Sequence, residues 1–180
     1  YLAQGLCERG HEVTIACRSH AEAPHPNVKF ALLRKFAIGS AWRHWAFARS
    51  LEQFIARDKT RFDAVFALGR TWSQDIVRVS GGCHQTWVNN LPGTEQASRL
   101  PHKDRVKLRL EARSFAPGAY RKVICNSDMV RQDVIRRHAV PAQAIEVIYN
   151  GVDLERFNPR HRDTAGAEIR REAGFSKDNV

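Results

Sequence analysis

The chain has 180 residues, of which 43% are hydrophobic and 27% are charged. This composition fits one globular domain plus a remnant and disfavours a wholly disordered chain. The sequence contains no run of about 18 apolar residues that could span a membrane. A formal net charge of +10 favours an anionic partner, such as a nucleic acid, an anionic membrane surface or a phosphorylated substrate. The alternative is a basic surface that serves only to keep the protein in solution.

The chain begins with one helix-like and two strand-like segments. Residues 2–10 have helical spacing and end on a glycine, a common residue after a helix. Residues 11–17 ("HEVTIAC") and 28–33 ("VKFALL") are short and contain β-branched or aromatic side chains, which predicts strands. Residues 40–59 group their apolar side chains as a helix does, and Ser40 can cap its start.

The middle of the chain holds a further strand, an ambiguous segment and a basic helix. Residues 62–68 ("FDAVFAL") form a continuous apolar run, as expected for a strand covered on both faces. Residues 75–80 ("DIVRVS") fit either a short strand or the end of a helix. Residues 103–115 have a helical pattern and are strongly basic.

The last third predicts a strand, a helix and another strand. Residues 122–125 ("KVIC") and 145–149 ("IEVIY") have strand composition. Residues 127–138 predict a helix with Ser127 at its N-cap, an acid in its first turn and basic residues in its last, a charge order that suits the helix dipole. Strands that alternate with helices are typical of an α/β fold with a doubly wound parallel sheet.

Ligands of such sheets bind beyond the carboxyl ends of the strands. This rule directs attention to four loops: residues 18–27, 68–74, 81–93 and 150–153.

The four cysteines of the chain are far apart and form no C-x-x-C pair. We therefore expect free, buried thiols in a reducing compartment rather than disulfides or a zinc site. His20 and His25 are too isolated to indicate a metal site, so no metal ligand is predicted.

Residues 120–159, "YRKVICNSDMVRQDVIRRHAVPAQAIEVIYNGVDLERFNP", resemble the signature of family 4 glycosyltransferases of the GT-B fold. "GLCERGHEVTIAC" (residues 5–17) and "RFDAVFALG" (residues 61–69) are similar to earlier strands of the same family. The resemblance implies a Rossmann-like domain that forms the N-terminal, acceptor-side half of a GT-B fold.

The same resemblance implies two domains in the chain. Residues 1–159 correspond to the acceptor-side domain without its first strand, and residues 160–180 correspond to the start of the nucleotide-sugar domain. Residue 1 is not Met and lies within a helix-like segment, so we expect a fragment truncated at both ends. Such a fragment lacks the Gly-rich turn and the donor domain, and we expect it to be inactive alone.

The turn at Asn150 and Gly151 follows the last predicted strand and has no partner strand after it, which disfavours an ordinary hairpin. In the family this turn leads from one domain towards the other. Gly151 supplies the backbone freedom that a turn needs, and Asp153 can bind nearby amides. Phe157 can fill an apolar seam, and Pro159 stops further strand pairing.

His84 is the candidate catalytic residue, in the loop "SGGCHQTWVNN". It matches the position at which many relatives place a histidine facing the sugar, where an imidazole can orient a hydroxyl or stabilise developing charge. The alternative is a loop histidine without such a role. The resemblance to lipopolysaccharide-core glucosyltransferases also places Asp75 near the cleft, although a capping or surface acid is an equal alternative.

The predicted substrate-binding residues share positions at strand ends or in the interdomain turn. They are Asp75, Ser127, Asn150, Gly151 and Asp153, and for Ser127 a purely capping role is the main alternative.

A basic amphipathic helix is predicted near residues 98–122, and it can lie on anionic lipid. The cations assigned to this role are Lys103, Arg105, Lys107, Arg109 and Arg113. The alternative is a solvated helix that packs on the domain.

The resemblance therefore implies a retaining glycosyltransferase that moves a hexose from a nucleotide sugar, most simply a UDP-sugar, to a lipopolysaccharide-core or other glycolipid or glycan acceptor. It implies no cofactor and no metal, and a cytoplasmic protein held peripherally on the inner face of the membrane. Acceptor phosphates would suit the basic surface.

Two alternatives remain open at this point. A basic α/β nucleic-acid-binding module fits the charge, but no RRM, KH, helix-turn-helix or zinc-finger pattern is present, so no nucleic-acid partner is expected. A GT-B relative that is not a transferase, such as a sugar epimerase, fits the same motifs.

Overall fold

The structure is a computed structural model that describes residues 2–20, 25–33, 39–57, 61–91 and 100–175. The chain divides into two compact units, Tyr1–Ile148 and Tyr149–Val180. The first unit has an α/β fold with parallel strands, which confirms the predicted fold class. The predicted boundary after residue 159 stays a prediction.

The strands of the first unit form two parallel groups, one of two strands and one of four in the order β3-β4-β5-β6. Val77 pairs with Val123 across β4 and β5, and Cys125 pairs with Val147 across β5 and β6. The ambiguous segment at residues 75–80 is therefore a strand. The strands are β1 (Val13–Cys17), β2 (Val28–Leu32), β3 (Phe66–Ala67), β4 (Ile76–Val79), β5 (Lys122–Cys125) and β6 (Ile145–Val147).

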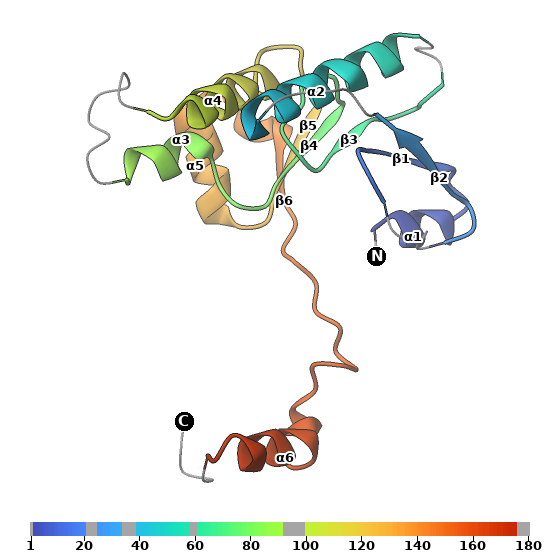
Figure 1. The fold of residues 1–180 in the computed structure, drawn as a ribbon, viewed down its shortest axis with the longest axis vertical. Coiled ribbons are helices and arrows are strands. Elements are labelled where there is room, and N and C mark those ends of the chain that lie inside the picture. Colours follow the sequence, from blue (N-terminus) through green and yellow to red (C-terminus); the bar gives the residue numbers. More distant parts are fainter. Residues whose placement is uncertain (1, 21–24, 34–38, 58–60, 92–99, 176–180) are drawn as a thin grey trace. The chain divides into compact units, whose positions relative to one another are not determined.

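The helices of the first unit lie between the strands in the chain, except for α1, which precedes β1. Helices α2 and α4 run side by side (Figure 1). The helices of this unit are α1 (Leu2–Cys7), α2 (Ser40–Ala56), α3 (His84–Asn89), α4 (His102–Ser114), α5 (Asp128–His138) and the 3₁₀ turn η2 (Ala142–Ala144). The prediction that Ser40 caps α2 is wrong. Ser40 is the first residue of the helix, and Gly39 holds the N-cap position with φ of 82°, a value that favours glycine.

Two buried groups of side chains hold these elements together. One joins the sheet to α5 through residues such as Val123, Cys125 and Val134, each 0% exposed. The other joins α2 to α4 around Ala48 and Leu110, also 0% exposed. One face of β5 and one face of α5 are therefore buried, as the spacing of their apolar residues predicts for a strand and an amphipathic helix.

The cysteines are free, as predicted. Cys7, Cys83 and Cys125 are buried and Cys17 is half-buried. Burial raises the pKa of the Cys125 thiol to about 11, so the thiol stays protonated at neutral pH.

The second unit continues from β6 without pairing to a further strand among its described residues, in agreement with a turn that is not a hairpin. The carboxylate of Asp153 accepts the backbone N–H groups of Glu155 at 3.1 Å and Arg156 at 3.0 Å, which confirms its predicted contact with nearby amides. The unit also contains the 3₁₀ turn η3 (Pro159–Arg162) and helix α6 (Ala165–Glu172). Phe157 is 63% exposed within this unit.

None of the helices in the described residues is both long enough and apolar enough to cross a membrane.

Candidate functional site

The loop that follows β4 is tied to the end of β5 at the carboxyl edge of the sheet. The backbone N–H of Asn126 donates to Val79 O at 3.3 Å, and the Asn126 side chain donates to Ser80 O at 2.8 Å. Gly82 then has φ of 74°, in the region that disfavours other residues. The loop therefore has a fixed start and a glycine-dependent turn before it enters α3.

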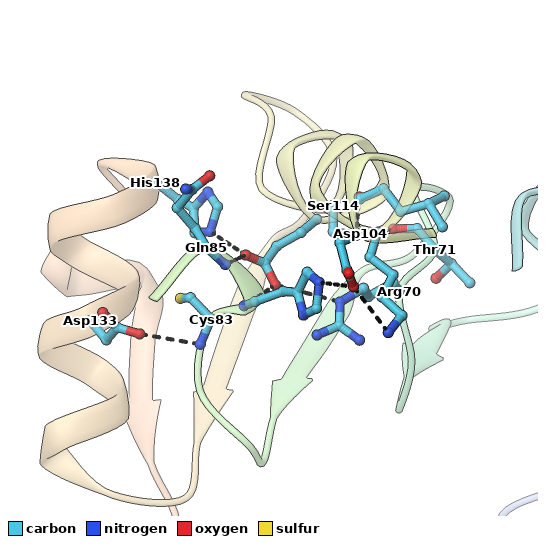
Figure 2. A network of polar contacts seen from close by, with 12 residues as sticks. Arg70, Thr71, Cys83, Gln85, Asp104, Ser114, Asp133 and His138 are labelled. Carbon is cyan, nitrogen blue, oxygen red and sulfur yellow. Dashed lines mark hydrogen bonds and ion pairs between the residues drawn. The ribbon is translucent and has the colours of Figure 1, made fainter. Parts of the chain in front are cut away.

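Two carboxylates from other helices cap the start of α3. The first N–H groups of a helix have no partner within it, and the side chain of the N-cap residue, Cys83, does not cap them. Glu111 of α4 accepts the N–H groups of His84 at 2.7 Å and Gln85 at 3.2 Å. Asp133 of α5 accepts the N–H of Cys83 at 3.2 Å, and Figure 2 shows this contact. Negative charge at this end of α3 also suits its dipole.

Glu111 is the centre of the network. The residue is 4% exposed, and its carboxylate also contacts Nε2 of His138 at 3.2 Å and Nε of Arg70 at 3.5 Å. Burial raises the pKa of Glu111, but the hydrogen bonds from His138 and from the backbone of His84 and Gln85, with the charge of Arg70, outweigh it, and the pKa lies below its ordinary value. Glu111 is therefore a buried carboxylate held in its charged form by donors from three elements.

Asp133 is a second buried carboxylate that hydrogen bonds and a nearby cation hold in its charged form. Its carboxylate accepts the Thr86 hydroxyl at 2.6 Å and lies 3.8 Å from Nε of Arg137. Burial raises the pKa of Asp133, but hydrogen bonds from Thr86 and Cys83 and the charge of Arg137 hold the pKa below its usual range. The turn that carries His84 is thus fixed from two sides.

The ligand atoms of Cys83, Glu111 and His138 lie within 4.8 Å of one another, a spacing that a metal ion could use. Burial, followed by the charges of Asp133 and Glu111, strongly raises the pKa of the Cys83 thiol, and a thiol must lose its proton to bind a metal. Both Glu111 oxygens already accept N–H donors. These groups fit a hydrogen-bond junction better than a metal site.

The His84 imidazole is held on two sides. Its Nε2 lies 3.1 Å from Oδ1 of Asp104, and its ring stacks on Trp87 with centroids 5.0 Å apart. His84 is 7% exposed and Asp104 is 1% exposed. Because a carboxylate only accepts hydrogen bonds, Nε2 carries the proton and Nδ1 is the acceptor nitrogen of the neutral ring.

The charge state of His84 follows from its neighbours. Burial lowers the pKa of His84 most, and the charges of Arg70 and Lys107 lower it further, while Asp104 raises it; the net direction is down. Nζ of Lys107 lies 3.6 Å from the same Asp104 oxygen. At neutral pH the ring is therefore neutral and can accept through Nδ1.

A sequence model of Glycosyltransferase Family 4 matches residues 1–156, most of the chain. The chain belongs to glycosyltransferase family 4.

Two individual proteins place this family 4 chain among known relatives. A protein of Burkholderia thailandensis described as a probable transglycosylase is 26% identical over 166 residues, which cover 88% of this chain and 41% of that protein. The crystal structure of WaaG, described as a glycosyltransferase involved in lipopolysaccharide biosynthesis, matches with a TM-score of 0.79 at 15% identity. That match covers 99% of this chain and 47% of WaaG, and it confirms the GT-B type of fold. The chain spans less than half of either relative.

The family 4 fold separates the predicted substrate-binding residues into three places. Ser127 lies at the carboxyl edge and accepts the N–H of Val130 at 3.3 Å, which confirms its capping role. Asp75 lies at the amino end of β4, where its carboxylate accepts the N–H of Val65 at 2.8 Å, so the structure does not bring it to His84 or Ser127. Asn150, Gly151 and Asp153 belong to the second unit.

The predicted membrane-binding cations differ in their surroundings. Lys103, Arg105 and Arg109 are exposed. The guanidinium of Arg113 lies 3.9 Å from the centroid of the Trp72 ring, a cation–π contact that also reaches Trp45 at 5.6 Å. Lys107 contacts Asp104, as described above. Two of the five cations thus have partners within the domain.

Three acids that fix His84 and its turn were not predicted from the sequence: Asp104, Glu111 and Asp133. One signal was present: Asp104 and Glu111 are seven residues apart in a basic helix, so they share one helix face with apolar residues. Acids on the buried face of a helix indicate partners inside the domain.

Proposed function

We propose that the protein is a retaining glycosyltransferase that moves a hexose from a nucleotide sugar, in the first instance a UDP-sugar, to a phosphorylated lipopolysaccharide-core glycolipid or other glycan. Family membership supports a transferase, and WaaG, which shares the fold, is described as acting in lipopolysaccharide biosynthesis. The observation that carries the proposal is the placement of His84, which follows the glycine turn at the carboxyl end of β4 and is fixed by Asp104.

In the proposed reaction the bond between the anomeric carbon and the donor diphosphate breaks, and that carbon joins the acceptor hydroxyl oxygen, whose proton is released. Nδ1 of His84 would accept a hydrogen bond from a sugar hydroxyl, since Nε2 is bound to Asp104. Positive groups would stabilise the leaving diphosphate, and a nucleotide-sugar lobe would close over the donor. This chemistry requires no metal or other cofactor.

The test is the release of UDP from UDP-hexoses by the full-length protein, with and without a lipopolysaccharide-core acceptor. We expect His84→Gln to lower kcat by about 100-fold, the range found when one transition-state hydrogen bond is removed. His11→Gln is the matched control, because His11 is exposed beside the amino end of β1. Turnover of His84→Gln within about twofold of the parent protein would remove His84 from the mechanism.

We also propose that α4 contacts an anionic membrane surface, on the inner face of the cytoplasmic membrane. Its exposed cations Lys103, Arg105 and Arg109 support this, because each surface cation near anionic lipid contributes about 1 kcal/mol. Trp42 of α2 is 53% exposed and its ring lies 5.8 Å from that of His102 at the start of α4, which adds an aromatic side chain suited to the lipid interface.

A further inference from the structure

Helix α4 holds His84 at two points. Glu111 accepts the backbone N–H of His84 at 2.7 Å, and Oδ1 of Asp104 lies 3.1 Å from Nε2 of its ring. The two acids are about two helical turns apart, so they lie on the same face of α4. The Trp87 ring, which stacks on the imidazole at a centroid distance of 5.0 Å, adds a third contact. These contacts fix one orientation of the ring, with Nε2 on Asp104 and Nδ1 directed away from it.

The other ring nitrogen remains open to a ligand. Within the described residues no hydrogen bond engages Nδ1 of His84. Of the fully buried side-chain polar atoms in that part of the chain, only Oδ1 of Asn126 lacks a partner, so Nδ1 of His84 is not sealed inside the domain. A neutral imidazole that donates through Nε2 accepts through Nδ1, which suits a sugar hydroxyl.

Lys107 shares the Asp104 oxygen with His84. Its Nζ lies 3.6 Å from Oδ1 of Asp104, whose side chain is 2% exposed. In a Ser-His-Asp triad the acid stabilises the positively charged imidazole, which lets the histidine act as a base. Here the ammonium offsets the carboxylate charge at the same oxygen, so that stabilisation is weakened. The geometry therefore favours a neutral ring that accepts a hydrogen bond over a base that takes up a proton.

The remaining charged groups near the ring do not reverse this balance. Burial lowers the pKa of His84 most, the charges of Arg70, in the loop after β3, and of Lys107 lower it further, and Asp104 opposes them. The other titratable groups contact the backbone of the turn or one another. They are Glu111 of α4, Cys83 of the turn itself, and Asp133 and His138 of α5.

We propose that Asp104 and Lys107 are positioning residues of the transferase: Asp104 holds the His84 ring as the tautomer whose Nδ1 accepts a sugar hydroxyl, and Lys107 offsets the Asp104 charge that would draw a second proton onto the ring. This inference rests on the proposed transferase function. Lys107 then belongs to the site rather than to the predicted membrane surface, and His84 is a hydrogen-bond acceptor rather than a general base.

Nitrogen NMR of the histidine rings in the full-length protein reads the tautomer without any sugar donor. The His84 signals are assigned with His84→Gln. At neutral pH we expect a neutral ring that carries its proton on Nε2. Asp104→Leu should lose the preference for that tautomer, because leucine cannot accept the Nε2 hydrogen. Lys107→Met should make the ring titrate at higher pH, because the ammonium no longer offsets the charge of Asp104.

Asp104→Asn separates the charge from the hydrogen bond. The amide oxygen should stay on His84 and Lys107, since both present N–H donors there. The single variant should therefore retain the Nε2–H tautomer. Asp104→Asn combined with Lys107→Met removes the second donor, so the amide can turn its nitrogen towards Nε2. The double variant should therefore show a mixture of the two tautomers.

Turnover should follow the tautomer and the charge of the ring. With a UDP-hexose and a lipopolysaccharide-core acceptor, Asp104→Leu should lower kcat about 30-fold, with the KM for the donor changed by less than about twofold. Asp104→Asn should restore kcat to within about threefold of the parent protein, because it keeps the tautomer. Lys107→Met should move the acid limb of the kcat profile to higher pH, since a protonated ring cannot accept a hydrogen bond.

Glu168→Gln is the matched control. Glu168 is also an acid in the first turn of a helix, and its carboxylate lies 3.7 Å from a basic partner three residues further on, Arg171. It belongs to α6 of the second unit and has no histidine to position. Its turnover, pH profile and His84 signals should match those of the parent protein.

Several outcomes would overturn the proposal. They are a parent His84 that is protonated at neutral pH or carries its proton on Nδ1, a Lys107→Met variant with unchanged titration and acid limb, and an equal change in Glu168→Gln. Loss of kcat in Asp104→Leu with the His84 tautomer unchanged would give Asp104 a structural role and would also overturn it. The transferase function fails separately, since a parent protein with the expected tautomer and titration but no sugar transfer would retain the positioning of His84 and reject the activity.

Discussion

Replacing Glu111 by Gln should destabilise the first unit by about 3 kcal/mol. The carboxylate accepts the N–H of His84 at 2.7 Å and three further donors. The amide keeps one acceptor oxygen and turns the other position into a donor, so at least one buried N–H loses its partner at a cost of about 1–3 kcal/mol. The lost charge at the start of α3 and beside Arg70 adds about 0.5–1 kcal/mol.

The assay combines urea unfolding, followed by circular dichroism, with hydrogen exchange at the amides of His84 and Gln85. A loss of about 3 kcal/mol in an opening equilibrium should speed exchange there by about 100-fold. The matched control is Glu146→Gln on the exposed side of β6, expected to change stability by less than about 0.5 kcal/mol.

The pH dependence gives a second check on Glu111. Its pKa is lowered in the folded protein, so its carboxylate stabilises the fold above the pKa of the unfolded chain, about 4.3. That contribution is lost as the pH falls through the lower folded value. The difference between the parent protein and Glu111→Gln should therefore shrink below pH 4. A difference under about 1 kcal/mol at pH 7, with unchanged amide exchange, would refute the capping role of Glu111.

Three further outcomes are expected. Ser127→Ala should lower the free energy of unfolding by about 1 kcal/mol in urea melts, because it removes the N-cap of α5, and Ser127→Gly should cost less. Gly82→Ala should lower the free energy of unfolding by about 1–2 kcal/mol in the same melts, because alanine is strained at the positive φ of this position. Steric overlap adds nothing, since the new Cβ would lie 3.9 Å from the nearest atom, an ordinary contact distance. Changing Lys103, Arg105 and Arg109 together to Glu should abolish sedimentation with anionic liposomes while leaving the melting curve unchanged; salt-insensitive sedimentation of the parent protein would count against a membrane surface.

Elements with a strong local pattern were predictable from the sequence. The helix at Asp128–His138 carries its own cap, charge order and apolar face, and its predicted bounds agree with α5 to within one residue. The strand KVIC and the long helix α2 are equally clear, because β-branched runs and helical spacing are local signals. The resemblance in residues 120–159 then led to the family that the comparisons confirm.

The start of α3 was not predictable in this way. The sequence predicts a loop at residues 84–89, because a helix of six residues has little periodicity and this one has no cap of its own. Its capping acids are 27 residues away, at Glu111, and 50 residues away, at Asp133, so only the folded chain brings them together. The position of Asp75 at the amino end of β4 was also beyond the sequence, since alignment by spacing cannot tell the two ends of a short strand apart.

The capping of α3 by distant acids limits how this segment can be exchanged between scaffolds. A graft of residues 80–90 into another protein would carry the histidine but leave behind the acids on α4 and α5 that hold its backbone. The transplanted turn would then fray in water and lose its register. Residues from α3, α4 and α5 here act as one structural unit, so any transfer of this segment must move Glu111 and Asp133 along with the histidine whose backbone they hold.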